Sequence, residues 1–156
     1  MFFKKNKVGK GISEAALAVV SDIETAKQCR VLCSNDNSAS WLSTEIMIQE
    51  VNALEFIIWS EYGQHYEWAN IDFFERNITK GILASNHQKE LSYVILKGVN
   101  RLQSIEGEGE ERLYKVYKSS ADLVSKYEPD LKQEELINFI QQQVELFIKN
   151  CEKYFY

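Results

Sequence analysis

The feature that most constrains this chain is the return of apolar residues every three or four positions, which recurs in six stretches. Such spacing places the apolar side chains on one face of an α-helix, and it is the strongest structural signal in a single sequence. Only one proline, Pro129, and seven glycines interrupt the 156 residues, which suits long helices better than strands joined by many turns. The pattern therefore predicts an all-α protein, an antiparallel bundle of five or six helices.

The positions of the helices follow from the same pattern and from their end signals. The stretch from Trp41 to Tyr62 is apolar on nearly every side, which is typical of a helix at the centre of a bundle. Ser13, Ser85 and Asp130 have short polar side chains that can cap the first backbone N–H groups of a helix. Two glycines among four glutamates at 106–111 predict a loop. The expected helices cover about residues 14–33, 41–62, 70–84, 86–105, 113–127 and 131–154.

The length fits one domain, but charge is distributed unevenly along it. Four lysines lie in the first ten residues with no acid before Glu14, while the whole chain carries a formal net charge of −5. We therefore expect a flexible basic N-terminal segment at residues 1–12 and a single helical domain at residues 13–156. The alternative for residues 1–10 is peripheral contact with an anionic membrane or an acidic partner. An acidic chain binds phosphates poorly, so nucleic acid is not an expected partner.

No segment has the apolar length of a membrane span or of a secretory signal. The most apolar stretch, Trp41–Trp59, is interrupted by three glutamates, and Ala15–Val20 is too short for the apolar region of a signal peptide. Cys29, Cys33 and Cys151 are an odd number, which does not suit a secreted disulfide framework. We expect a cytoplasmic protein whose reduced cysteines act as small apolar residues.

Aromatic residues are concentrated between Phe56 and Phe74. These positions hold seven of the nineteen Phe, Trp and Tyr residues in the chain. Tyr and Trp give a large contact area at low entropic cost and are enriched where proteins bind one another. The alternative is that most of them are core residues whose polar tips reach the surface. The candidate contact residues are Trp59, Tyr62, Tyr66 and Trp68.

The last helix carries the clearest apolar stripe. Its members alternate steps of three and four positions over about two and a half heptads, fewer than the three or four that indicate a coiled coil. The stripe therefore predicts one helix of a bundle, and the alternative is pairing with a second copy of the chain. If the helix pairs, Phe147 and Tyr154 are expected contact residues. The stripe consists of Ile137, Ile140, Val144, Phe147, Cys151 and Tyr154.

Two carboxylate–histidine pairs are the best candidates for a metal or acid–base site. Glu61 and His65 are four positions apart, and His87 and Glu90 are three apart. A carboxylate can orient an imidazole for proton transfer or for binding a metal. Di-iron bundles use Glu-x-x-His on two helices together with two further glutamates, and neither pair here has that order. We therefore expect no metal and no cofactor, and keep the two pairs as an alternative site.

No catalytic motif accompanies the helical pattern. Gly9 and Gly11 have the wrong spacing for a phosphate-binding loop, and the sequence contains no nucleophile elbow. Cys29 and Cys33 end a predicted helix, whereas a redox pair favours closer spacing at a helix N-terminus. We expect an interaction protein more than an enzyme, which binds itself or a partner such as an effector, a toxin or an assembly component. The alternative is a ligand- or metal-binding bundle with enzymatic activity at the two carboxylate–histidine pairs.

Overall fold

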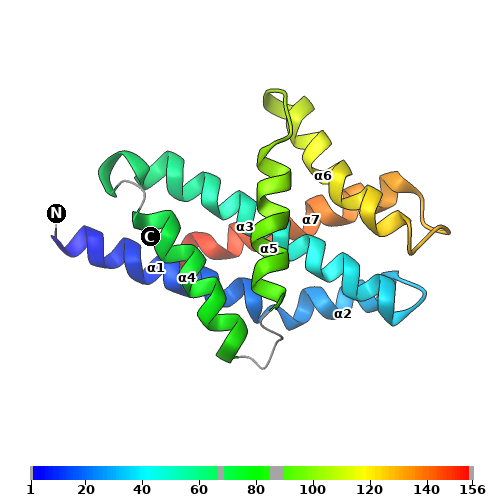
Figure 1. Ribbon diagram of the computed structural model, residues 1–156, viewed down its shortest axis with the longest axis horizontal. Helices are drawn as coiled ribbons and strands as arrows, with labels where there is room; N and C mark the ends of the chain where they lie inside the picture. Colours follow the sequence, from blue (N-terminus) through cyan, green and yellow to red (C-terminus); the bar gives the residue numbers. More distant parts are fainter. Residues whose placement is uncertain (1, 67–68, 85–89, 155–156) are drawn as a thin grey trace.

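Most residues that the structure describes lie in helices. The computed structural model describes the backbone of residues 2–66, 69–84 and 90–154, and the side chains of residues 9–60, 74–82 and 90–154. Within these residues it contains seven α-helices, one short 3-10 helix and no strand, which confirms the all-α bundle (Figure 1). The elements are α1 (Phe2–Val20), α2 (Ile23–Leu32), α3 (Asp36–Tyr66), α4 (Ala69–Ala84), α5 (Glu90–Gln103), α6 (Gly109–Ser125), α7 (Gln133–Cys151) and the 3-10 helix η1 (Glu152–Tyr154).

The long helix α3 is the centre of the molecule, as its apolar circumference predicted. It packs against each of the other six α-helices. Figure 1 shows α3 running through the middle, with α1 and α4 toward one end and α6 toward the other, while α7 runs from beside α6 back toward α1 and α5 lies across α3. Leu42, Ile48 and Ile58 point to different sides of α3, and all three are buried. The helix is longer than expected, because it begins at Asp36 and continues without a break to Tyr66.

The apolar core has two parts, and α3 contributes to both. The first lies mainly among α1, α4, α5 and the middle and second half of α3, with the end of α7 against it. The second lies among α2, α6, α7 and the first half of α3. The largest fully buried side chains are Phe74, Ile12, Leu42, Ile46, Ile48, Leu54, Ile58, Ile78, Ile82, Ile95, Leu102 and Leu136.

The first expected helix is divided in two, which corrects the prediction of one helix over residues 14–33. α1 ends at Val20 and α2 begins at Ile23. Asp22 causes the break locally, because its carboxylate accepts hydrogen bonds from the backbone N–H of Thr25 at 3.0 Å and from its hydroxyl at 2.5 Å. Leu17 and Val31 fit the apolar spacing of a single helix over residues 14–33, but both side chains are exposed in the divided arrangement.

The start of α1 is also earlier than predicted. α1 begins at Phe2, so Ser13 lies inside the helix and does not cap it. Ile12 is fully buried with Ala15 and Val19 in the first core, so the buried face of α1 begins before Ser13. The predicted boundary between residues 12 and 13 therefore lies inside α1, while the flexibility of residues 1–12 stays a prediction.

The last helix begins at Gln133 and packs inside the bundle. Asp130 does not cap it, since the N-cap position is Lys132 and has no side-chain cap bond. The apolar stripe from Ile137 to Cys151 is buried against the chain's own helices. The predicted loop before α6 is present, and Gly107 and Gly109 take left-handed backbone angles there, with φ of 123° and 59°.

Gly98 lets α5 approach α3 closely, and replacing it is expected to destabilise the fold. A Cβ at position 98 would lie 2.5 Å from Cδ1 of Ile48 and 2.9 Å from both of its γ carbons, which sit too near the backbone to move aside cheaply. We expect Gly98→Ala to lower the free energy of unfolding by about 1–3 kcal/mol. The matched control is Gly9→Ala in α1, where a Cβ meets nothing within 4 Å. Urea unfolding of both variants tests this, and equal stabilities would contradict it.

Candidate functional site

The second half of α3 has one face that the other helices leave uncovered. Phe56 is 68% exposed and Trp59 is 56% exposed, three positions apart on the same side of the helix. The exposed and half-buried residues beside them lie on one continuous arc, and none of them is charged. These residues, named here the Phe56–Trp59 surface, are Asn52, Ala53, Phe56, Ile57, Trp59 and Ser60.

The composition of the Phe56–Trp59 surface resembles that of the centres of protein interfaces. The centres of protein interfaces are depleted of charged residues and enriched in aromatic ones, and Trp is among the residues that contribute most binding free energy. Exposed aromatic side chains are in contact with water, and burying them against a partner would be energetically favourable. The Phe56–Trp59 surface therefore offers two adjacent anchors with small and polar residues around them.

The structure places the predicted contact residues in different surroundings. Trp59 is exposed, as a contact residue must be. The backbone of α3 continues through Tyr62 and Tyr66, whose side chains lie outside the described residues, as does Trp68 entirely. Phe147, by contrast, is only 7% exposed and belongs to the first core, so its side chain is not available to a partner in this fold. Tyr154 is half-buried against the same core.

The alternative metal site lies largely outside the described side chains. α3 runs through Gly63, so Glu61 and His65 lie four positions apart on one helix, but their side chains are not described. His87 lies outside the described residues, and Glu90 is exposed at the first position of α5. Among the described residues, no group of three His, Cys, Asp or Glu side chains is placed to hold a metal ion. The use of the two carboxylate–histidine pairs therefore stays a prediction.

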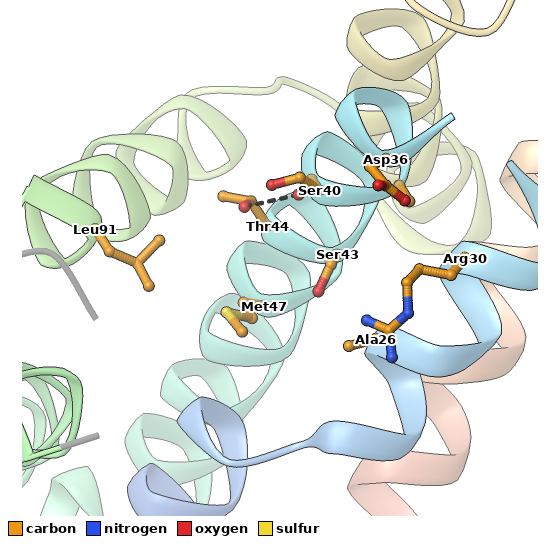
Figure 2. Close-up of a pocket in the computed structure, with 9 residues that line it drawn as sticks. Ala26, Arg30, Asp36, Ser40, Ser43, Thr44, Met47 and Leu91 are labelled. Atoms are coloured by element: carbon orange, nitrogen blue, oxygen red, sulfur yellow. Dashed lines mark hydrogen bonds between the residues drawn. The ribbon is translucent and has the colours of Figure 1, made fainter. Parts of the chain in front are cut away.

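A groove of about 580 Å³ opens between α2 and the start of α5, with α3 as its floor. Figure 2 shows Ser43, Thr44 and Met47 on α3, Arg30 on α2 across from them, and Leu91 on the other side. Small polar side chains dominate the floor, while Met47 and Leu91 make one end apolar. The lining residues are Ala26, Arg30, Asp36, Ala39, Ser40, Ser43, Thr44, Met47 and Leu91.

The lining of this groove carries one guanidinium, one carboxylate and three hydroxyls. One hydroxyl is already used, since that of Thr44 donates to the backbone carbonyl of Ser40 at 2.9 Å. The groove is therefore a polar cleft whose shape depends on where α2 lies.

Three glutamates of α3 are buried, and the first has a cationic partner. Glu45 is 2% exposed, and its carboxylate accepts hydrogen bonds from the Arg101 guanidinium at 2.5 Å and from the Ser120 hydroxyl at 2.7 Å. The amide of Gln49 donates to the Ser120 hydroxyl and to the backbone carbonyl of Val116, each at 2.8 Å. This network joins α3, α5 and α6 around a compensated charge.

The other two glutamates have no cationic partner. Glu50 is fully buried and neither carboxyl oxygen has a hydrogen-bond partner, so burial raises its pKa well above the ordinary value of 4.5. Burial also raises the pKa of Glu55 to about 8, and the neighbouring carboxyl of Glu75 on α4 adds to the effect. Two carboxyl groups in contact can hydrogen-bond only if one keeps a proton. Gln103 donates to Glu55 at 3.0 Å and opposes the shift only in part.

A fourth buried acid is held in its charged form. Glu128 lies in the segment between α6 and α7, where it is 1% exposed. Its carboxylate accepts hydrogen bonds from the backbone N–H of Ser34 and from the hydroxyls of Ser34 and Ser38, the latter two at 2.7 Å. These bonds lower the pKa of Glu128 and fasten the connection between α2 and α3 to that segment.

The cysteines are structural in this fold. Cys29, Cys33 and Cys151 are free and buried. Burial raises the pKa of Cys29 and of Cys151 to about 12, so both remain thiols near neutral pH. A protonated thiol is a poor nucleophile. Cys29, Cys33 and Cys151 pack among the apolar residues of the two core parts.

No described helix combines the length and the apolar character needed to cross a bilayer. No protein-family model, no curated protein and no solved structure matches this chain.

Proposed function

We propose that this protein acts by binding another protein, and that the Phe56–Trp59 surface on α3 makes the contact. The observation that carries the proposal is the exposure of two large aromatic side chains in a stretch of α3, residues 52–60, whose exposed and half-buried side chains carry no charge. Burying both rings against a partner would remove their apolar area from water. The partner is either a second copy of this chain or a different protein.

A cytoplasmic location is part of the same proposal. The support is that Cys29, Cys33 and Cys151 are all free and sit where apolar side chains would serve equally well. Such use of cysteine suits a compartment that keeps thiols reduced. Peripheral membrane contact through residues 1–10 stays an alternative prediction.

Self-association gives the first test of the binding surface. Light scattering over a range of concentrations would report the mass of the wild-type chain and of the double variant Phe56→Ser/Trp59→Ser. If the partner is a second copy, we expect a dimer whose dissociation constant rises at least about tenfold in the double variant, because truncated anchor residues commonly cost this much. The matched control is Val31→Ser/Leu146→Ser, which removes from other helices two apolar side chains that are 81% and 55% exposed.

A monomeric wild-type chain would direct the test to a different partner. A photoreactive amino acid at position 59 would then be compared in cells with the same amino acid at position 31. We expect a discrete crosslinked protein from position 59 only, and its loss when Phe56→Ser is added. Crosslinks of equal yield at both positions, together with a monomeric wild-type chain, would contradict the proposal.

A further inference from the structure

The helix α2 is the least firmly attached of the helices around α3. It has only ten residues, and only Thr25 and Cys29 among them are buried. Ile23 and Val31 point to solvent, with 67% and 81% of their surface exposed. α7, which packs against the same part of α3, is nineteen residues long and buries six of them. Separating α2 from the bundle therefore exposes much less apolar surface than separating α7.

Glu50 lies where α2 and α7 meet α3. The groups near enough to interact electrostatically with its carboxyl are Asp22 at the N-cap of α2, Cys29 on α2 and Cys151 at the end of α7. Both carboxyl oxygens are buried without a hydrogen-bond partner. The site accommodates a neutral carboxylic acid far better than a carboxylate.

The groups around Glu50 do not compensate the negative charge that its carboxylate would carry. Asp22 is negative, and the thiols of Cys29 and Cys151 are neutral near pH 7. Two cations lie nearby, Arg30 beside Cys29 and Lys153 beside Cys151, but neither pairs with Glu50. No described charged group of α1, α4, α5 or α6 has a resolved effect on Glu50.

We propose that α2 is a protonation-controlled lid, which lies closed on α3 while Glu50 holds a proton and lifts away when Glu50 ionises. The buried carboxylate has no partner in the closed form, so its charge favours a form in which water reaches it. Lifting α2 is the least costly way to admit that water, because α2 contributes the fewest buried side chains. The raised pKa of Glu50 places the transition above the range of an ordinary glutamate.

Opening the lid changes the groove as well. Ala26 and Arg30 on α2 form one wall of the groove, as Figure 2 shows. When α2 moves, that wall moves with it, and the buried thiol of Cys29 reaches solvent. The proposal therefore links an increase in pH to a wider cleft on α3, independently of the Phe56–Trp59 surface.

Labelling of Cys29 with a neutral maleimide tests the lid. The chain used is full length and carries Cys33→Ala/Cys151→Ala, so that Cys29 is the only thiol. Its labelling rate is divided by the rate for the same chain in urea at each pH, which removes the ordinary effect of thiol ionisation. We expect this ratio to rise at least about tenfold between pH 6 and pH 9, the change that one unit of pKa difference gives.

Two variants separate the lid from general loosening. Glu50→Gln keeps the shape but cannot ionise, so its labelling ratio is expected to stay low and flat with pH. Glu24→Gln makes the same change at an exposed position of α2 and is expected to behave as the parent. A Glu50→Gln ratio that rises as the parent's does would overturn the proposal, and so would a parent ratio that does not rise.

Hydrogen exchange of the wild-type chain provides a measurement that needs no substitution. After correction for the intrinsic rates, amides of α2 are expected to lose much more protection between pH 6 and pH 9 than those of α7, which follow only the global stability of the chain. An equal loss of protection in both helices would overturn the proposal, because the whole bundle and not α2 alone would then be opening.

Discussion

Between pH 5 and pH 9, the free energy of unfolding is expected to fall by about 4 kcal/mol from Glu55 alone. The pKa of Glu55 is about 8 in the folded chain and near 4.5 when the chain is unfolded. Within that window the folded state holds a proton that the unfolded state has released. Raising the pH therefore favours unfolding until Glu55 ionises in the folded state as well, and the stabilisation is complete only below pH 4.5.

Urea unfolding at pH 5, 7 and 9 measures this slope directly. In Glu55→Gln the slope is expected to become shallower, and the variant is expected to exceed the wild type in stability at pH 9. Glu128 acts in the opposite direction, because its pKa is lowered and its contribution is lost only as the pH falls below the ordinary glutamate range. A wild-type stability that rises from pH 5 to pH 9, or an unchanged slope in Glu55→Gln, would show that Glu55 does not hold its proton.

Replacing Arg101 with methionine is expected to destabilise the protein by about 3 kcal/mol. The change leaves the carboxylate of Glu45 buried without its cation, since only Ser120 continues to donate to it. The Arg101 side chain is 36% exposed, so the effect comes mainly from the uncompensated Glu45, whose side chain is 3% exposed. Thermal and urea unfolding near neutral pH measure the loss.

The controls distinguish a buried charge from lost packing. Adding Glu45→Gln to Arg101→Met is expected to recover part of the loss, because a neutral amide can still accept from Ser120. Lys115→Met also removes a cation from an ion pair, but both partners are exposed, so a change below about 0.5 kcal/mol is expected. Equal losses from Arg101→Met and Lys115→Met would contradict the argument.

The fold class was predictable because the composition of α3 indicates that this helix lies at the centre of the bundle. A helix that is apolar around most of its circumference must be covered by other helices on most sides. α3 is covered in this way except at faces such as the Phe56–Trp59 surface. The buried stripe of α7 was recognisable for a related reason, since Ile140, Val144 and Phe147 keep helical spacing without interruption. Both signals come from large apolar residues that keep helical spacing along the helix without interruption.

The break between α1 and α2 was missed because the apolar spacing continues across it. Leu17, Val20 and Ile23 suit one stripe, yet Leu17 and Ile23 are exposed. The buried face of α1 instead contains small residues such as Ala15, and small residues contribute little to the apolar pattern of a sequence. The local signal was Asp22 three positions before Thr25, the spacing of a helix N-cap.

The buried glutamates were also open to inference, but they were interpreted only as interruptions of an apolar segment. If α3 is covered on most sides, then Glu45, Glu50 and Glu55 cannot all reach water. The sequence could not show which of them meets a cation, because Arg101 lies on a helix that is distant in the chain. Only part of the Phe56–Trp59 surface was predicted. Trp59 was a candidate contact residue, whereas Phe56 was not distinguished from the aromatic residues of the core.

The position of α3 in both parts of the core has a consequence for how the chain can be divided. A fragment that stops before α3 leaves the apolar residues of α1 and α2 without the helix against which they pack. A fragment that starts after α3 leaves the apolar residues of α5, α6 and α7 uncovered for the same reason. No cut on either side of this helix yields two pieces that fold separately. New sequence is better accommodated at Gly107, where the backbone already turns through solvent.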